Sequence, residues 1–144
     1  MEPIEILLVE DNPDHAELTR RSLEGGSMAN KVTWVKDGQE ALDYLFKKGS
    51  FIDAPRPGLI LLDINLPKIN GVEVLKKVKE TEALRVIPVI MLTTSDRDEE
   101  ALKCYSFGAN SFITKPVKFS EFSEKVKSLK LYWLLVNRPP NPDA

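Results

Sequence analysis

Four apolar segments of the sequence each end in polar or charged side chains. Glu10 and Asp11 follow the first segment, Asp63 ends the second, Thr93 ends the third, and Lys115 follows the fourth. Three carboxylates that lie close together cannot all stay ionised without a compensating positive charge. A hard divalent cation such as Mg²⁺, which takes oxygen ligands, is the usual compensation. If the fold brings these segment ends together, the residue types predict a site for a metal ion and a phosphoryl group.

Asp63 is the residue of this set that suits a nucleophile. A carboxylate can attack phosphorus and form an acyl phosphate when a metal ion neutralises charge on the incoming group. The backbone carbonyl of Asn65, two residues further on, would supply another oxygen to the metal. The Thr93 hydroxyl and the Lys115 ammonium would hold the remaining phosphoryl oxygens. Each residue alone could be a cap or part of a solvated turn, so the prediction depends on their joint occurrence at four segment ends.

Alternating strands and helices are predicted to position these side chains. Apolar runs rich in β-branched residues predict strands at Ile4–Val9, Lys31–Lys36, Leu59–Asp63, Pro88–Thr93 and Ser111–Thr114. Helices are predicted to begin near Asp14, Gln39, Gly71, Asp96 and Phe119, the second ending at Lys48 and the last at Val136. This order predicts an α/β fold: a flavodoxin-like, doubly wound, five-stranded parallel sheet in the order 2-1-3-4-5, with five helices of which the last is extended. The four segment ends would meet at the carboxyl edge of this sheet.

Length and composition fit a single domain with a substantial core. The 144 residues are 42% hydrophobic, and 20 basic residues against 22 acidic ones give a net charge of −2. This balance argues against sequence-independent nucleic-acid binding, which needs a basic surface. No apolar run approaches the roughly 20 residues of a membrane span. Since the single cysteine, Cys104, excludes an internal disulfide, we expect a cytoplasmic protein that binds neither nucleic acid nor membrane, with the only histidine, His15, at a helix surface.

The segments ILLVED, LILLDINLPKINGVE, PVIMLTTS and SFITKP together resemble the receiver domain of two-component response regulators. The resemblance runs from Ile4 to Leu129. It implies that residues 1–136 form a receiver domain, followed by a Pro-rich tail at 137–144 and no output domain. It also implies that a histidine kinase phosphorylates Asp63, which would make the protein a phosphoacceptor in signalling and not an enzyme.

The same resemblance implies roles for the residues at the segment ends. Asp11, Asp63 and the Asn65 carbonyl would bind Mg²⁺ or Mn²⁺, and Glu10 would reach the metal through water. Lys115 would contact the phosphoryl group. The resemblance thus implies specific roles for residues whose types already suit metal and phosphoryl binding.

Receiver domains signal through a hydroxyl and an aromatic side chain, which here would be Thr93 and Phe112. Thr93 would move to bond the phosphoryl group, and Phe112 would then swing inward to fill the vacated space. Phe112 stands where Tyr is more familiar, and Thr94 stands where a smaller Ala or Gly is usual, so we predict that Thr94 crowds access of the phosphoryl group. The resemblance also implies a cis peptide bond between Lys115 and Pro116, since X-Pro bonds readily adopt this form.

The end of the last helix, LKLYWLLV, is apolar nearly all round and should be covered. It could pack against its own domain, but a self-complementary homodimer contact is the preferred hypothesis. The contact would involve the fourth helix, the fifth strand and the fifth helix. Its candidate residues are Tyr105, Phe119, Phe122, Leu131, Tyr132, Trp133 and Leu135. The helix extension and the long loop Gly49–Gly58 resemble the single-domain regulators of bacterial phytochrome kinases, so a phytochrome-type sensor kinase is the expected partner.

Other functions share parts of this pattern. A relay intermediate or phosphate sink for another sensor kinase would use the same residues. An aspartate phosphatase of the dehalogenase type needs a second acid two residues after the nucleophile, where this chain has Asn65. A flavin carrier needs a phosphate-binding loop after the first strand, where Glu10 and Asp11 would repel a phosphate. The intact set of acids, threonine and lysine argues against a scaffold without phosphoryl chemistry.

Overall fold

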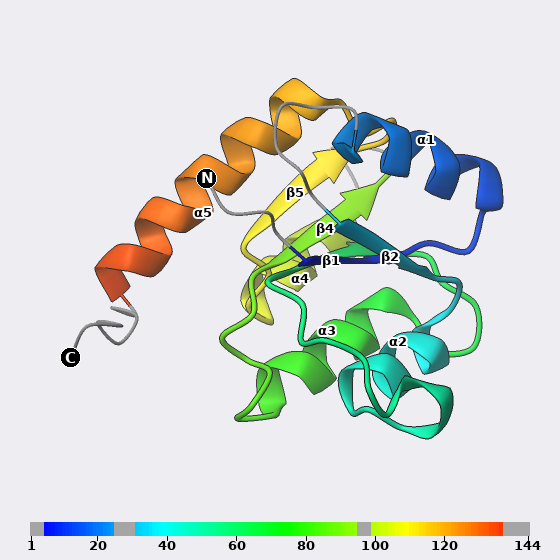
Figure 1. Ribbon diagram of the computed structural model, residues 1–144. Helices are drawn as coiled ribbons and strands as arrows, with labels where there is room; N and C mark the ends of the chain where they lie inside the picture. The colour runs from blue at the N-terminus through cyan, green and yellow to red at the C-terminus, as the bar shows by residue number, and fades with distance from the viewer. Residues whose placement is uncertain (1–4, 25–30, 95–98, 137–144) are drawn as a thin grey trace.

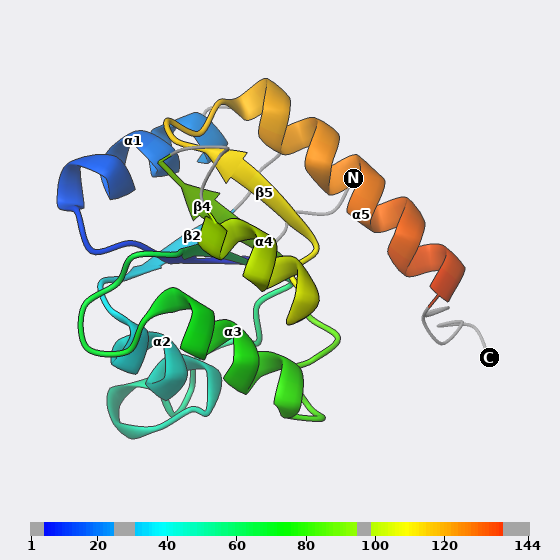
Figure 2. The ribbon, with the colours of Figure 1, turned by 180° about the vertical axis from the view of Figure 1, so that it is seen from behind.

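The computed structural model describes residues 5–24, 31–94 and 99–136 and shows one parallel sheet between two layers of helices (Figures 1 and 2). The strands are β1 Glu5–Val9, β2 Lys31–Val35, β3 Leu59–Asp63, β4 Val89–Thr93 and β5 Ser111–Thr114. They pair in the order β2-β1-β3-β4-β5, and each pair is parallel. The predicted α/β fold and its strand order are confirmed.

The helices divide between the two faces of the sheet. They are α1 Pro13–Glu24, α2 Gly38–Leu45, α3 Gly71–Glu80, α4 Glu99–Ser106 and α5 Phe119–Val136. Helices α1 and α5 cover one face, and α2, α3 and α4 cover the other (Figures 1 and 2). Each face has its own buried apolar cluster, one containing Leu23 and Phe122 and the other Val78 and Cys104. Within the described ranges, no helix is long and apolar enough to cross a membrane.

The strands that carry the site are central to the sheet. Every residue of β3 and β4 is buried, which explains why both segments are apolar almost throughout. Helix α3 covers them with a stripe of Val74, Leu75 and Val78, all of them fully buried, as the helical spacing predicts. Burying each such side chain contributes roughly 1.5–3 kcal/mol. Asp63 is the last residue of β3, and it therefore lies at the carboxyl edge of a rigid central strand.

One predicted helix start agrees with the structure to within one residue, and one predicted helix end differs. Helix α1, predicted to begin near Asp14, begins at Pro13, whose missing N–H costs nothing because the first N–H groups of a helix have no partner within it. Helix α2 ends at Leu45 and not at Lys48, because Lys47 has a φ of 55°, outside the range of a right-handed helix. These residues lie away from the strand ends, and the predicted convergence does not depend on them.

The loop after α2 contains a short 3₁₀ helix at Gly49–Phe51 that the sequence pattern did not predict. The Phe51 ring packs edge-on against Tyr44 of α2, with 5.4 Å between the ring centroids. This aromatic contact fixes part of a segment predicted as irregular. The start of the fourth helix predicted near Asp96 lies outside the described residues, and α4 is described from Glu99.

Candidate functional site

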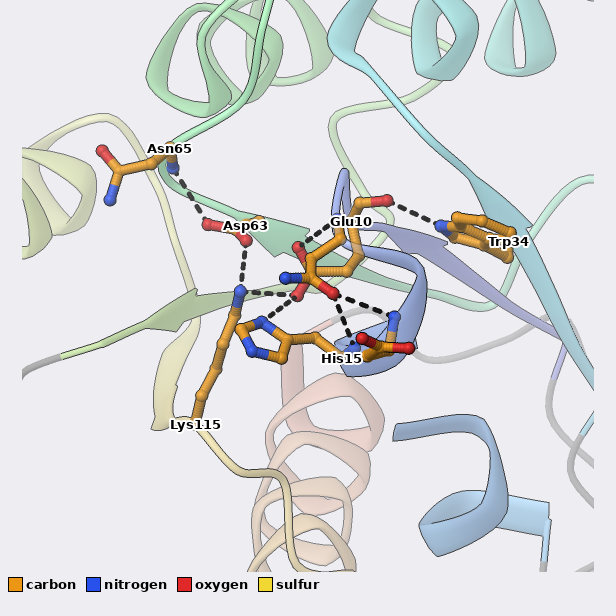
Figure 3. Close-up of polar contacts among 8 residues, drawn as sticks. Glu10, His15, Trp34, Asp63, Asn65 and Lys115 are labelled. Carbon is orange, nitrogen blue, oxygen red and sulfur yellow. Dashed lines mark hydrogen bonds and ion pairs between the residues drawn. The ribbon is translucent and has the colours of Figure 1, made fainter. Parts of the chain in front are cut away.

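The carboxyl ends of β1, β3 and β5 bring three charged side chains together. Lys115, the residue after β5, points its ammonium at Asp63 and at Glu10 (Figure 3). Its Nζ forms an ion pair with Asp63 Oδ2 and lies 2.5 Å from Glu10 Oε1. Both carboxylates are buried, so these ionic contacts are shielded from bulk water. The structure thus brings three of the predicted site residues into direct contact.

Glu10, Asp11 and Asp63 form a cluster of oxygen ligands at the same edge of the sheet. One carboxylate oxygen from each lies within 4.8 Å of the others, and Asp11 is exposed whereas the other two residues are buried. Mg²⁺ and Mn²⁺ take oxygen donors, and Mg²⁺ usually retains several waters. The cluster therefore fits a hard divalent cation that is reached from the solvent on the side of Asp11.

Burial changes the protonation of the cluster. Burial first, and then the neighbouring Asp63, raise the pKa of Glu10 from 4.5 to about 7 against the opposing effect of Lys115. For Lys115, burial disfavours the ammonium, but Asp63 and Glu10 outweigh this effect and raise the pKa of Lys115 above its usual range. Lys115 is therefore a fixed positive charge at neutral pH, whereas Glu10 would lose its proton more readily if a further cation bound beside it.

The start of α1 and the edge strand β2 hold Glu10 in place. The Asn12 backbone N–H donates to Glu10 Oε2 at 3.4 Å, and Asn12 Oδ1 accepts from the backbone N–H groups of Asp14 and His15. The Trp34 indole N–H donates to the backbone carbonyl of Glu10 at 2.6 Å, and His15 Nδ1 lies 3.6 Å from Glu10 Oε1 (Figure 3). Neither Asn12 nor Trp34 was predicted as a site residue. The Asn-Pro pair that opens α1 is a capping signal, but nothing in the pattern of β2 indicates the indole bond.

The turn after β3 fixes the carboxylate of Asp63. The Asn65 backbone N–H donates to Asp63 Oδ1 at 3.0 Å, and the Asn65 side chain points away from Asp63 (Figure 3). The Gly71 N–H donates to the Ile64 carbonyl at 3.0 Å, and Asn70 caps α3 through the N–H of Val72. A Cβ at Gly71 would lie 2.1 Å from the Asp63 carbonyl oxygen, so only glycine allows this close approach. The Asn70-Gly71 pair predicted the start of the helix, but the sequence pattern did not indicate that only glycine fits at position 71.

A second glycine joins α2 to the same turn. A Cβ at Gly38 would lie 2.0 Å from the Ile69 carbonyl oxygen, so the start of α2 packs directly on the turn after β3. Asp37 caps α2 by accepting from the Glu40 N–H at 2.8 Å, and Lys68 Nζ lies 3.4 Å from Asp37 Oδ2. Burial works against the ionised form of Asp37, but the Glu40 N–H and the Lys68 ammonium lower its pKa below the usual value. The turn that follows Asp63 is thus anchored on α2 as well as on α3.

The residues of the predicted switch lie on β4 and β5. Thr93 ends β4 and is buried, Thr94 follows it and is exposed, and Phe112 is half-buried on β5. The Phe112 ring packs against Tyr105 of α4, with 4.4 Å between the centroids. The peptide bond between Lys115 and Pro116 is cis, which confirms that prediction. Phe112 therefore contacts the surface helix α4. It lies on β5, the strand that Lys115 follows directly.

The candidate residues for a dimer surface fall into three groups. Tyr105 is 53% exposed and Phe119 is half-buried, so both are accessible on α4 and α5. Phe122 is 0% exposed, because this side of α5 packs on the sheet, and its assignment to a dimer surface is corrected: it is a core residue. Four candidates near the end of α5 lie outside the side chains that the structure describes: Leu131, Tyr132, Trp133 and Leu135.

The chain is similar in sequence to known proteins over nearly its whole length. The chain is 44% identical over 142 residues to the probable methanogenesis regulatory protein FilR2 of Methanothrix harundinacea, covering 98% of this chain and 90% of that protein. The match includes both ends of the described fold. The chain therefore resembles a protein of nearly its own length and not only one segment of a larger protein.

Solved structures and a family profile agree with this relationship. The bacteriophytochrome response regulator AtBRR superposes with a TM-score of 0.82 at 45% identity, covering 96% of this chain and 100% of that one. The Mn²⁺-bound form of response regulator Rcp1 gives 0.75 at 34% identity and covers 96% and 100%, and the phosphorylated cyanobacterial phytochrome response regulator RcpA gives 0.76 at 37% and covers 96% and 99%. The profile of the response regulator receiver domain matches residues 6–127. The chain belongs to the response regulator receiver domain family.

Proposed function

We propose that the protein is a phosphoacceptor switch, in which Asp63 takes a phosphoryl group from the phosphohistidine of a sensor kinase in the cytoplasm. The observation that carries the proposal is the contact of Lys115 with both Asp63 and Glu10, beside Asp11. It combines a nucleophile, a fixed cation and a set of metal ligands. An Asp63 carboxylate oxygen would form the new O–P bond while the donor N–P bond breaks, and the electron pair of that bond would leave with the donor imidazole.

Glu10, Asp11, Asp63 and the backbone carbonyl of Asn65 would hold Mg²⁺ or Mn²⁺. The clustered carboxylate oxygens and the manganese in the Rcp1 structure support this assignment. When bound, such an ion supplies positive charge that stabilises the phosphoryl oxygens in transfer. The Asn65 N–H, which already donates to Asp63 Oδ1, would keep the carboxylate oriented. Lys115 would turn its ammonium from Asp63 to the phosphoryl group.

Thr93 and Phe112 would carry the change at Asp63 to the protein surface. Thr93 ends β4, the strand that pairs with β3, and its hydroxyl would bond a phosphoryl oxygen. Phe112 would then move inward, away from the Tyr105 ring that it contacts in this structure. Because Tyr105 is exposed on α4, the rearrangement would alter a surface that a partner can read.

The output would be a contact between proteins. We infer that residues 1–136 act as a receiver domain, and the match of the receiver-domain profile to residues 6–127 supports this. A homodimer through α4, β5 and α5 is part of the proposal, with Tyr105 and Phe119 among the contacting residues. Asn65 replaces the second acid that a turnover phosphatase needs, so the chain would modify itself and no external substrate.

The proposed kinase partner is a phytochrome-type light sensor. The names of AtBRR and RcpA, which are similar over 96% of this chain, support that partner. FilR2 is about equally similar and is named for methanogenesis, which supports a sensor kinase of another class as the second candidate partner; for that kinase the chain would act as a relay intermediate or phosphate sink. Phosphotransfer rates from purified kinases of the two classes, measured side by side, would decide between them.

Incubation with acetyl phosphate and Mg²⁺, followed by intact mass spectrometry, tests the phosphoacceptor assignment. We expect a gain of one phosphoryl group in the wild type and none in Asp63→Asn. Asp53→Asn, which changes an exposed aspartate on the loop after α2, is the matched control and should be phosphorylated like the wild type. An Asp63→Asn protein that still gains the group, or a wild type that does not, would contradict the proposal.

A further inference from the structure

We propose that the ion pair of Lys68 with Asp37 positions the metal site, by holding the turn after β3 at a fixed distance from Glu10. The proposal rests on the metal site of the proposed function. It adds Lys68 as a positioning residue, which would act through the turn and not as a ligand. Neither member of the pair was predicted to belong to the site.

The two oxygens of one buried carboxylate hold two different elements. Asp37 Oδ1 accepts from the Glu40 N–H at 2.8 Å and so caps α2, while Asp37 Oδ2 lies 3.4 Å from Lys68 Nζ. The Asp37 side chain is 7% exposed and the Lys68 side chain 68%. Asp37 stays ionised despite its burial, because the Glu40 N–H and the Lys68 ammonium lower its pKa. Lys68 is therefore held by a fixed negative charge at the start of α2.

The backbone at Lys68 shows that this part of the turn is constrained. Lys68 has a φ of 65°, in the left-handed region that residues with a Cβ rarely adopt. The next residue is in direct contact with α2, since a Cβ at Gly38 would lie 2.0 Å from the Ile69 carbonyl oxygen. The ion pair offsets part of the cost of this conformation. It thereby fixes the segment that begins three residues earlier with Asn65, whose carbonyl is a proposed metal ligand.

The segment that carries Asp37 also contacts the other half of the acid cluster. The Val35 carbonyl accepts from the backbone N–H of Glu10 at 3.1 Å, and the Trp34 indole N–H donates to the Glu10 carbonyl at 2.6 Å (Figure 3). The end of β2 thus holds the backbone of Glu10, and the residue that caps α2 holds Lys68 in the turn after β3. Mg²⁺ demands near-ideal octahedral geometry, so the distance between the two halves of its ligand set should determine how well it binds.

The charge of Lys68 gives positioning and simple electrostatics opposite signs. Lys68 is a cation close in sequence to the proposed ligands Asp63 and Asn65. If it acted only through its charge, Lys68→Met would raise Mg²⁺ affinity, because a nearby cation repels a metal ion. If it positions the turn, the same variant lowers Mg²⁺ affinity, because the ligands lose their fixed spacing. The direction of the change therefore distinguishes the two roles.

Calorimetric titration of the full chain with Mg²⁺ measures this direction. We expect Lys68→Met and Asp37→Asn each to lower Mg²⁺ affinity about three- to fivefold, the upper part of the range for an ion pair with an exposed member. The Asp37→Asn side chain keeps an oxygen that can cap α2. Lys68→Arg keeps the charge and should restore the wild-type affinity. In the double variant the two losses should not add, because both substitutions remove the same pair.

The chain offers a matched control for Lys68→Met. Lys47 is also an exposed lysine with a left-handed backbone, at a φ of 55°, but it lies beyond the other end of α2. Lys47→Met should keep the wild-type Mg²⁺ affinity.

Hydrogen exchange measured by NMR in EDTA tests the same role without a metal. The Gly71 N–H, which closes the turn on the Ile64 carbonyl at 3.0 Å, should exchange faster in Lys68→Met than in the wild type. Amides of the central strand β4, which report global unfolding, should exchange at the wild-type rate and show that the variant is folded.

The outcomes separate this proposal from the proposed function. If the wild type binds Mg²⁺ and Lys68→Met keeps or raises the affinity, the role of Lys68 is overturned and the metal site itself stands. Additive losses in the double variant, an equal loss in Lys47→Met, or unchanged exchange of the Gly71 N–H would overturn that role in the same way. If the wild type does not bind Mg²⁺, the metal site of the proposed function fails, and the role of Lys68 fails with it.

Discussion

The indole N–H of Trp34 donates a 2.6 Å hydrogen bond to the backbone carbonyl of Glu10. The bond runs from the edge strand β2 to the residue that follows β1, so a half-exposed aromatic side chain holds the backbone from which the acid cluster begins. Because Glu10 and Asp11 are consecutive, any shift of this carbonyl would displace both carboxylates.

Trp34→Phe should therefore weaken the site as well as the fold. The phenyl ring keeps most of the apolar contact but cannot donate, and we expect a loss of about 1 kcal/mol in the free energy of unfolding. Mg²⁺ affinity should fall in parallel, because the backbone of Glu10 is less constrained. Urea denaturation and calorimetric titration measure the two effects. Ile52→Ala, which truncates another exposed apolar side chain, should leave Mg²⁺ affinity unchanged, and a Trp34→Phe protein with wild-type affinity would contradict this role.

Gly71→Ala should displace the turn that follows Asp63. The new Cβ would lie 2.1 Å from the Asp63 carbonyl oxygen, a backbone atom that cannot move without the strand. We expect a loss of roughly 1–3 kcal/mol or more in stability, as for an overpacked core, together with slower phosphorylation by acetyl phosphate. The matched control is Gly49→Ala, where φ is +59° but no atom lies within 4 Å of the added Cβ. It should lose stability without slowing phosphorylation; equal slowing in both variants would contradict the steric argument.

The stability of the protein in EDTA should fall as the pH rises from about 4.5 to about 7. The pKa of Glu10 is raised from 4.5 to about 7, so the folded state holds this proton more tightly than the unfolded chain does. The contribution of Glu10 to the free energy of unfolding, on the order of 3 kcal/mol, is complete below pH 4.5 and is lost as the pH approaches 7. Urea denaturation across this range should show the decline in the wild type and in Glu17→Gln, an exposed acid on α1. A Glu10→Gln variant with an undiminished decline would show that another group is responsible.

Thr94→Ala should speed phosphoryl exchange at Asp63. Thr94 follows β4 directly and is exposed, so its truncation should leave the core and the stability of the protein nearly unchanged. We expect faster phosphorylation by acetyl phosphate and faster hydrolysis of the product, because the smaller side chain would give both reactants easier access. The rates are followed by intact mass over time. Unchanged rates would refute the predicted crowding.

Light scattering tests the proposed dimer. A homodimer has a mass near twice 16.2 kDa, and Tyr105→Glu should shift the protein towards the monomer by placing a charge on the α4–β5–α5 surface. Tyr105 also packs on Phe112, so Tyr105→Phe is the control that keeps this ring contact and should keep the dimer. A wild type that stays monomeric at high concentration would remove the dimer from the proposal.

The sequence predicted the parts of the site that depend on strand order. Asp63, Glu10 and Lys115 lie at strand ends, and parallel βαβ topology alone brings such ends together. The apolar runs that predicted the strands are long and unambiguous, because the central strands are buried on both faces. Residue types and topology were therefore sufficient for the charged centre.

The supporting contacts were not predictable in the same way. The bonds from Trp34 to Glu10 and from Lys68 to Asp37 join segments whose closeness depends on side-chain packing, which a one-dimensional pattern does not contain. Phe122 was misassigned because an aromatic residue on an amphipathic helix fits both a core and an interface. Its position one turn before Val126, which is also buried, places it on the side of α5 that faces the sheet.

The two glycines that pack against the Asp63 turn affect how variants of this protein should be interpreted. In a saturation library selected for signalling, positions 38 and 71 should tolerate substitutions as poorly as position 63, although glycine has no side chain to take part in chemistry. Scoring the same library for protein abundance would separate the two causes. Substitutions at Gly38 and Gly71 should lower abundance, whereas substitutions at Asp63 should abolish signalling in a protein that accumulates normally. The two readouts would thus distinguish positions 38 and 71, which need glycine for steric reasons, from position 63, which needs aspartate for its chemistry.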